Sequence, residues 1–421
     1  MRLRPGLSVL WRRKGESQVG IDPRCAVVLE DLEVAEQQVL DHLRHEPTEA
    51  DLLRVGKVAG VGPERVRELV TLLERSGVVD LKAPARRTPI PSAVPSEVAY
   101  WSRLMHDGDG GAVLAARERA TVTVVGLDQV GMRLATHLAE AGVGTLLLED
   151  DSAVGPDDVG PYHPRDIGAR RAAQAETQLR STFPRLRTSA PARTRPDVLV
   201  AISWAVADPV RLRPLLREDV VHLPVVIGEV DVCVGPLVVP GKGPCTRCMD
   251  LHRTDADPAW PALATQLRGS PAPGTSATAA QLGAAVAAHQ VLAALDGREL
   301  VIDRASLEVS GLSPLPVLRP WTVHPECGCD GVGRDGIDDS RDAGGRNGAA
   351  RADGASSERD SVDGGSSARD STDAGTSERN STDAGRSERN GTEAGPHVQD
   401  GDDVGDADRV KPAVEAVLRS A

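Results

Sequence analysis

The stretch from Thr121 to Asp151 limits the possible folds of this chain more than any other part of the sequence. Residues 121–125 are all Thr or Val, so they predict a buried strand, and Gly126 follows as a tight turn. Residues 130–141 carry an apolar stripe at helical spacing, and glycines then end the predicted helix. A leucine-rich strand at 146–148 and an acidic run complete one βαβ unit. Such a unit is typical of nucleotide-binding folds, in which an acid roughly 20 residues past the glycines holds a ribose.

The loop after the first strand departs from the sequence that holds a dinucleotide. That sequence is G-x-G-x-x-G, because its middle glycine lets the backbone approach a pyrophosphate at the helix N-terminus. Here the outer glycines are Gly126 and Gly131, whereas Asp128 stands at the middle position. A side chain there blocks the approach, and its negative charge repels phosphate. Two interpretations follow: a nucleotide-type fold whose first loop has lost phosphate binding, or one whose binding is weakened.

Composition argues against several functional classes. The 421 residues exceed one ordinary domain, and a hydrophobic content of 40% is enough for a sizeable core. A net charge of −13 argues against a general nucleic-acid or membrane-surface binder. Residues 1–20 contain no sustained apolar segment of a signal peptide, which predicts a cytoplasmic protein. The Ala-rich stretch 275–295 predicts a buried helix rather than a membrane span, since it contains Gln and His.

Changes in composition along the chain predict five segments. Residues 1–82 form a small module, and residues 83–99 form a proline-rich linker. Residues 100–333 alternate predicted strands and helices, the pattern of a doubly wound, mostly parallel α/β sheet of Rossmann-like type. A ten-residue repeat with almost no apolar residue lies within 334–408, so this tail is predicted to be disordered. The last segment, 409–421, has its apolar residues on one helical face and predicts a short helix.

The order of elements in the first segment predicts a winged helix. Strand candidates and helical patterns follow one another at 7–11, 18–21, 26–29, 33–44, 49–59, 63–76 and 78–81, the first three and the last being strands. Winged helices usually bind DNA, which requires a basic face to neutralise phosphates. This segment has 13 Lys and Arg against 14 Asp and Glu. That balance favours an extended peptide added to a sheet edge over DNA.

Four cysteines in two closely spaced pairs predict a metal site. The pairs are Cys245 and Cys248 in C-x-x-C, and Cys327 and Cys329 in C-x-C. Two thiolate pairs complete a closed tetrahedral Zn²⁺ site, which we favour over free thiols or a redox pair. The second pair begins 79 positions after Cys248, a gap that fits a metal tying a crossover segment to the end of a domain. Cys25 and Cys233 stand alone and are expected to be small buried hydrophobes.

Several motifs follow one another in a characteristic order. They are Ala141-Gly-Val-Gly144, Asp150, Asp166-Ile-Gly-Ala-Arg-Arg-Ala172, Cys245-x-x-Cys248, an Ala-rich helix at 283–295, and Cys327-Gly-Cys329. In this order they resemble the ThiF-type, ubiquitin-activating-like superfamily. The resemblance implies a fold that binds ATP and Mg²⁺, adenylates a peptide or protein C-terminus, and usually forms a homodimer.

The positions that bind the nucleotide in that superfamily are only partly kept. They fall on Gly126, Asp128, Gly131, Asp150 and Arg171. Asp150 matches the family pattern, and Arg171 keeps a positive charge where the family has a phosphate-contacting lysine. The family's Mg²⁺-binding aspartate falls on Trp204, and its other active-site positions fall on Ser152, Asp158, Pro161 and Tyr162. These departures imply that ATP and Mg²⁺ bind weakly or not at all. No cysteine lies between Asp250 and Ala280, where members that form a thioester carry theirs, so covalent transfer of a ubiquitin-like protein is not expected.

The N-terminal module in front of this fold resembles the PqqD-type modules that recognise leader peptides. The stretches Pro244–His252, Asp257–Trp260 and His324–Cys329 also look like the ThiF-like partner proteins of azoline-forming peptide biosynthesis. That resemblance implies a protein that presents a precursor peptide to a YcaO-type cyclodehydratase, which binds the ATP itself. One alternative is an adenylating enzyme in which Arg171 and Asp150 hold ATP and Asp151 serves Mg²⁺. Another is a winged-helix regulator whose Rossmann-like domain senses a metabolite.

Overall fold

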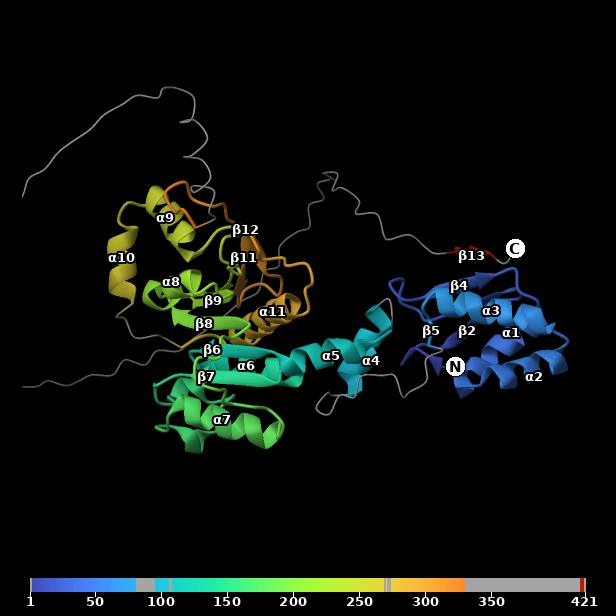
Figure 1. Cartoon of the computed structure of the whole chain (residues 1–421). Helices are drawn as coiled ribbons and strands as arrows, with labels where there is room; N and C mark the ends of the chain where they lie inside the picture. The colour runs from blue at the N-terminus through green and yellow to red at the C-terminus, as the bar shows by residue number, and fades with distance from the viewer. Residues whose placement is uncertain are drawn as a thin grey trace, which may run out of the picture. The chain divides into compact units, whose positions relative to one another are not determined.

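A computed structural model describes residues 2–80, 95–105, 108–268, 270, 274–329 and 417–419 (Figure 1). Two large hydrophobic cores share no residue: one lies within residues 3–79 and the other within residues 122–309. The linker residues 83–94 and the repeat tail 334–408 lie outside the described residues, so the disorder expected of the tail stays a prediction. The predicted domain limits likewise stay a prediction.

Residues 2–80 form an N-terminal module of short strands and three α-helices. Its elements are β1 (Arg2–Leu3), β2 (Val9–Arg13), β3 (Glu16–Val19), β4 (Val27–Glu30), α1 (Val34–Asp41), α2 (Glu49–Ala59), α3 (Pro63–Arg75) and β5 (Val79–Asp80), with the 3-10 helix His42–His45 after α1. β2, β3 and β4 are antiparallel neighbours, and β1 pairs with β5. The predicted order of strands and helices is present, whereas the assignment to the winged-helix class stays a prediction.

The sequence explains why the helices of this module begin, end and pack where they do. Thr48 caps α2, since its side chain accepts from the Asp51 N–H and the Asp51 carboxylate accepts in return. Gly60 ends α2 with a φ of 85°, which a glycine adopts without strain. The apolar face of α3 and the inner side chains of β4 belong to one core. Its buried members in these two elements are Val27, Leu29, Val66, Leu69, Val70 and Leu73. Burying each such side chain contributes roughly 1.5–3 kcal/mol to the free energy of folding, compared with leaving it exposed.

The last described residues of the chain form a strand, although the sequence predicts a helix there. β13 (Val417–Arg419) pairs in parallel with β4 and gives a four-stranded sheet in the order β13-β4-β3-β2 (Figure 1). The predicted helix 409–421 is therefore wrong at these three residues, and its other residues lie outside the described ones. So short a helix has little stability of its own in water. An edge strand, by contrast, offers a row of backbone N–H and C=O groups with which a second strand can form hydrogen bonds.

A seven-stranded sheet forms the centre of the larger part of the chain. Its order is β12-β11-β10-β9-β8-β6-β7. The strands are β6 (Thr121–Val125), β7 (Thr145–Glu149), β8 (Val198–Trp204), β9 (His222–Ile227), β10 (Asp231–Val234), β11 (Ala305–Ser310) and β12 (Val317–Pro320). β7, β6, β8 and β9 are parallel neighbours, and β10, β11 and β12 continue the sheet in antiparallel steps. Because β10 is antiparallel to β9 and β11 is antiparallel to β10, β11 runs in the same direction as β6, β7, β8 and β9. The mostly parallel, Rossmann-like sheet is thereby confirmed.

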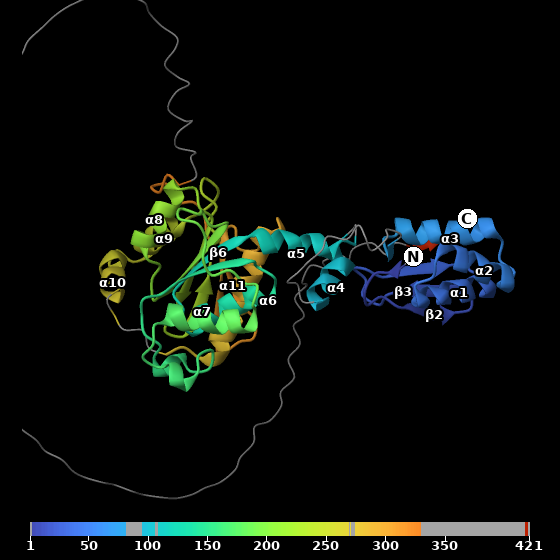
Figure 2. The same ribbon diagram turned by 60° about the horizontal axis from the view of Figure 1, so that its bottom comes forward.

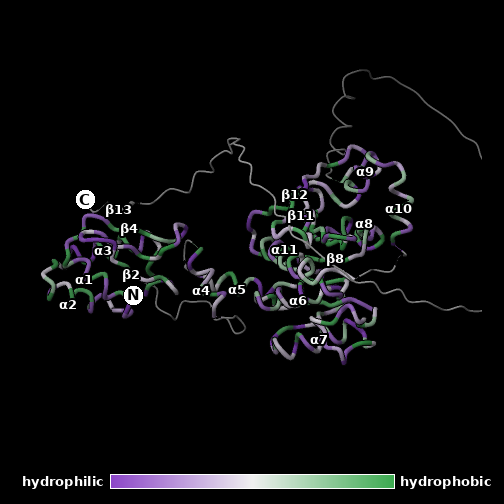
Figure 3. Tube along the Cα trace, turned by 180° about the vertical axis from the view of Figure 1, so that it is seen from behind, coloured by the Kyte–Doolittle hydropathy of each residue, from purple (hydrophilic) through white to green (hydrophobic). Residues whose placement is uncertain are grey.

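Helices pack on both faces of this sheet, with α6 and α11 on one face and α8 on the other. The helices of this part of the chain are α4 (Pro95–Leu104), α5 (Gly110–Arg119), α6 (Gln129–Glu140), α7 (Arg171–Thr182), α8 (Pro209–Arg217), α9 (Thr246–Ala256), α10 (Trp260–Leu267) and α11 (Ala277–Leu295). Alternate residues of β8 point to opposite faces: Val200 packs with α6 and α11, whereas Leu199 packs with α8. Figure 2 shows α6 and α11 close together, and Figure 3 shows hydrophobic residues gathered around the central strands.

Helix α11 is the one described helix that is long and apolar enough to cross a membrane, by length and composition alone. Half of its most apolar window is buried within the protein. Buried alanines of α11, such as Ala284 and Ala287, pack in the same core as Val232 of β10 and Leu134 of α6. Gly283 lies so close to the sheet that an added Cβ would stand 2.7 Å from Val232. The helix therefore packs as a core element, as the sequence predicts.

Three predicted boundaries differ from the structure. The helix predicted from Arg165 begins only at Arg171, because Gly168 has a φ of 87° and interrupts the helical backbone. Helix α4 begins at Pro95, so the last five residues of the predicted linker are helical. Proline suits a first helical turn, and the Glu97 carboxylate accepts from the Trp101 indole one turn later. The strand predicted over 230–239 ends at Val234.

Candidate functional site

The crevice at the carboxyl ends of β6 and β8 is where a doubly wound sheet binds ligands. The chain leaves β6 toward β7 and then crosses to β8 on the other side of β6, so the strand order reverses here. Gly126 ends β6 with a φ of 84°, and an added Cβ would lie 2.8 Å from the Ile202 carbonyl oxygen. At Gly131 an added Cβ would lie 1.9 Å from the Gly126 carbonyl oxygen. Both glycines are therefore required by close packing, whether or not a ligand binds.

Asp128 occupies the end of α6 that faces this crevice. It is the N-cap of α6, and its Oδ1 accepts hydrogen bonds from the backbone N–H groups of Val130 (2.9 Å) and Gly131 (3.1 Å). These are donors that an anion at a helix N-terminus would use. Burial raises the pKa of Asp128, although the two N–H donors and the charge of Arg171 act in the opposite direction. The chain's own carboxylate thus holds the position expected for phosphate.

The charged residues around Asp128 are also paired within the protein. Arg171 Nε donates to Asp158 (2.8 Å), and its Nη1 donates to Asp150 at the longer distance of 3.4 Å. Asp150 accepts from the backbone N–H groups of Leu127 (2.7 Å) and Ser152 (2.8 Å). The pKa of Arg171 is raised, because its hydrogen bond to Asp158 and the nearby carboxylates outweigh the lowering effect of burial. The arginine expected to contact phosphate is therefore engaged by two carboxylates.

Two residues named from the sequence only as active-site positions of the superfamily, Asp158 and Tyr162, make contacts in this site that the sequence does not predict. The Asp158 side chain is 4% exposed and makes the shorter contact to Arg171. Tyr162 is buried, and its hydroxyl donates to the Leu127 carbonyl oxygen (2.7 Å). Burial raises the pKa of Tyr162 well above its ordinary value. A single buried tyrosine leaves no periodic pattern, so the sequence contains no signal for this contact.

The residues considered for Mg²⁺ do not converge on the crevice. Trp204 at the end of β8 packs against the hydrophobic core. The side chain of Asp151 is 96% exposed and pairs with Arg170. Trp204 has no carboxylate, and the Asp151 carboxylate is turned to solvent. The carboxylates that line the crevice are those of Asp128, Asp150 and Asp158, which accept hydrogen bonds from the protein.

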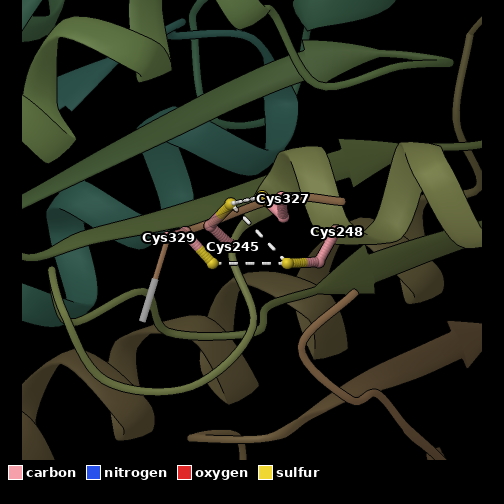
Figure 4. A group of neighbouring side chains, drawn as sticks. All are labelled: Cys245, Cys248, Cys327 and Cys329. Atoms are coloured by element: carbon pink, nitrogen blue, oxygen red, sulfur yellow. Dashed lines mark hydrogen bonds between the residues drawn. The ribbon is translucent and has the colours of Figure 1, made fainter. Parts of the chain in front are cut away.

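The four predicted cysteines come together as a second site (Figure 4). Cys245 caps α9 and Cys248 lies in its first turn, whereas Cys327 and Cys329 come from the loop after β12. The Sγ atoms of Cys245 and Cys327 are 3.5 Å apart, those of Cys248 and Cys329 are 3.3 Å apart, and those of Cys245 and Cys248 are 4.0 Å apart. These separations exceed a disulfide bond of about 2.05 Å. They bracket the roughly 3.8 Å that Zn–S bonds of about 2.3 Å give in a tetrahedron.

The chemistry of the four cysteines also suits a cation. Cys245 and Cys248 are buried, and Cys327 and Cys329 are partly buried. Burial, together with hydrogen bonds to and charges on the neighbouring cysteines, raises the pKa of Cys327 to about 12. Four thiolates crowd together only when a positive ion compensates their charge. The donor set and its spacing therefore fit a structural Zn²⁺ ion.

Three other metal-ligand side chains lie beside the cysteines but are already paired. They are His252 and Asp255 of α9 and the buried His324. The Glu326 N–H donates to His324 Nδ1 (3.1 Å), so the neutral imidazole carries its proton on Nε2, which donates to Asp255 (2.9 Å). A metal at Nε2 would have to displace this proton. These contacts hold the loop before Cys327 against α9, and they do not favour a second metal.

Comparison with solved structures identifies the fold. MccB from E. coli with ATP has a TM-score of 0.54 and 15% identity, and the match covers 78% of this chain and 98% of that chain. MccB with AMPCPP and SeMet MccA has a TM-score of 0.57 and 14% identity, covering 78% and 99%. SeMet PaaA has a TM-score of 0.57 and 14% identity, covering 76% and 99%. The chain has the ThiF-like fold. No family model matches the chain, and no curated protein matches it. At this level of identity the comparison establishes fold and leaves function to the site.

Proposed function

We propose that this chain is a zinc-stabilised, ThiF-like protein that binds a precursor peptide and presents it to a partner modifying enzyme of the YcaO cyclodehydratase type. Its own adenylation site is degenerate, and the chemistry that consumes ATP takes place on the partner. The protein works in the cytoplasm as a homodimer. It needs neither a nucleic acid nor a membrane.

The observation that carries this proposal is the Asp128 carboxylate on the N-terminus of α6. It satisfies two backbone donors that a phosphate would need. Arg171 is held by Asp158 and Asp150, so its charge is also compensated before any nucleotide arrives. A ligand at this crevice would have to break these contacts and would then face an uncompensated negative charge. This arrangement of charges does not favour the binding of ATP.

The peptide-binding part of the proposal rests on the N-terminal module. β4 lies at the side of the β2–β3–β4 sheet on which a further strand pairs. A peptide added there gains main-chain hydrogen bonds, so its affinity depends little on salt. A structural neighbour, the Microcin C7 biosynthetic enzyme MccB, has been solved in complex with N-formylated MccA. We infer by analogy that this chain also binds the substrate of a biosynthetic modification.

The test is a titration of the full chain with a candidate precursor peptide, chosen from short reading frames next to its gene, and in parallel with random duplex DNA. Each is measured at two ionic strengths. We expect saturable peptide binding that is nearly independent of salt and no tight DNA binding. Tight duplex binding that falls steeply with salt, without any response to the peptide, would replace this proposal by the winged-helix regulator.

A second candidate function is ATP-dependent adenylation of a peptide or protein C-terminus. Two observations favour it: Asp150 and Arg171 are kept, and a neighbour of the same fold has been solved with ATP. Peptide-dependent exchange of labelled pyrophosphate into ATP measures this activity directly. Exchange above the level of a chain carrying Arg171→Ala would favour the enzyme over the presenting protein.

A further inference from the structure

The two edges of the β2–β3–β4 sheet differ in how open they are to another strand. The β2 edge carries exposed Arg12 and Arg13, and its register shifts between Trp11 and Arg13. Charges and bulges of this kind protect an edge from strand addition. The β4 edge, Val27–Glu30, pairs with β3 without a register shift and contains neither proline nor basic residue. The β4 edge is therefore the one suited to a further strand.

A segment of the chain itself already pairs with that edge. Val417, Leu418 and Arg419 lie opposite Val28, Leu29 and Glu30, respectively, in a parallel register. The sequence separates β13 from β4 by nearly the whole chain. A segment that returns over such a distance to one particular edge has a role that local structure does not explain.

We propose that residues 417–419 are a built-in competitor, which occupies the peptide edge of β4 until a precursor peptide displaces it. This inference rests on the proposed function, in which an extended peptide pairs with the same edge. Both strands satisfy the same row of backbone N–H and C=O groups, so they exclude each other. The competitor also keeps an open edge from pairing with other chains while no precursor is present.

The fraction of molecules in which the segment occupies β4 sets the size of the expected effect. A segment that occupies the edge about 90% of the time leaves it open in roughly one molecule in ten. The apparent Kd of a competing peptide then rises about tenfold. A precursor of ordinary affinity still displaces the segment.

The test compares the full chain with a full-length variant that carries Leu418→Pro. Proline cannot donate a backbone hydrogen bond and is poorly accepted in an inner pairing. Thr382→Pro is the matched control, since it places the same residue in the tail outside β13. Hydrogen exchange of those amides of residues 27–30 that point away from β3 is measured without added peptide at several chain concentrations. We expect about tenfold faster exchange in Leu418→Pro than in the other two chains, independent of concentration.

A second measurement uses a labelled synthetic peptide with the sequence of residues 409–421 as the probe. We expect it to bind Leu418→Pro about tenfold more tightly than it binds the unmodified chain or Thr382→Pro, and to restore slow exchange at residues 27–30. Equal exchange and equal probe binding in all three chains would overturn the competitor. If the competitor is confirmed but Leu418→Pro binds no precursor peptide, the presenting function fails while self-occupation of β4 stands.

Discussion

Replacing Asp128 tests whether one side chain keeps nucleotide out of the crevice. Asp128→Gly removes both the carboxylate on the α6 N-terminus and the bulk at the middle position of the loop. A charge about 4 Å from a phosphate interacts with it by roughly 4 kcal/mol at an effective dielectric constant of 20, and solvent reduces this value. Even one third of that energy corresponds to about a tenfold change in affinity. The variant should fold, since glycine at an N-cap costs only a few tenths of a kcal/mol relative to aspartate.

Calorimetry with Mg-ATP is the assay, and Asp128→Asn is the matched control. Asparagine caps a helix as well as aspartate does, so it removes the charge and keeps both the cap and the bulk. We expect Asp128→Gly to bind Mg-ATP at least about tenfold more tightly than the unmodified chain, with Asp128→Asn in between. Micromolar binding by the unmodified chain would refute the closed site. No gain in Asp128→Gly would show that the Arg171 pairing excludes the nucleotide instead.

Comparing the unmodified chain with Asp128→Asn also tests how the free energy of unfolding depends on pH. Burial raises the pKa of Asp128 in the folded state above its ordinary value, so the folded state holds the proton more tightly than the unfolded state does. This side chain therefore lowers stability as the pH rises above the ordinary aspartate pKa through the raised one. Asp128→Asn cannot titrate, so its unfolding free energy should fall less over that acidic range. A steeper fall in Asp128→Asn than in the unmodified chain would contradict the assigned direction.

Three further predictions concern stability. Cys248→Ser should release zinc and lower the thermal midpoint of unfolding by about 10 °C, because a closed thiolate site couples metal binding to folding. Cys25→Ser is the control and should retain zinc. Metal analysis measures the zinc content of the two variants, and calorimetry measures their thermal midpoints. Arg117→Ala should cost about 3 kcal/mol in urea unfolding, since Arg117 is 1% exposed and its removal leaves the buried Asp296 carboxylate with Arg298 as its remaining ion-pair partner and the Ala141 carbonyl oxygen without its side-chain donor. Arg319→Ala removes a more exposed pair and should cost at most about 1 kcal/mol. Gly131→Ala should destabilise the chain more than Arg319→Ala does and leave little folded protein in circular dichroism, because its Cβ would lie 1.9 Å from the Gly126 carbonyl oxygen.

Periodicity and spacing predict those features of this chain that depend on local sequence. Alternation of strand and helix patterns between residues 121 and 310 was enough to predict the Rossmann-like sheet, because hydrophobic period reports which face is buried. The C-x-x-C and C-x-C pairs predicted the cysteine cluster for a similar reason, since each pair already presents two sulfurs to one ion. Both predictions need only one assumption about distant residues, namely that the predicted elements pack together in one domain.

Pairings between distant residues could not be predicted in this way. Nothing in the sequence around Val417 indicates that it pairs with Val28, since its apolar spacing suits a helix equally well. The partners of Arg171 were also out of reach, because a charge that contacts phosphate and a charge that forms an ion pair look alike in sequence. Asp158 lies 13 positions before Arg171, and only the folded loop brings the two together.

The two regions of the chain differ in whether their contacts can be exchanged for a ligand. At the crevice, the α6 donors accept a carboxylate from Asp128 that is covalently part of the same loop, so no free ligand competes on equal terms. At β4, one strand pairing can be replaced by another with the same number of backbone hydrogen bonds, so exchange is nearly balanced. This difference agrees with the proposed presenting function, in which the chain must hold a peptide and release it without performing the chemistry.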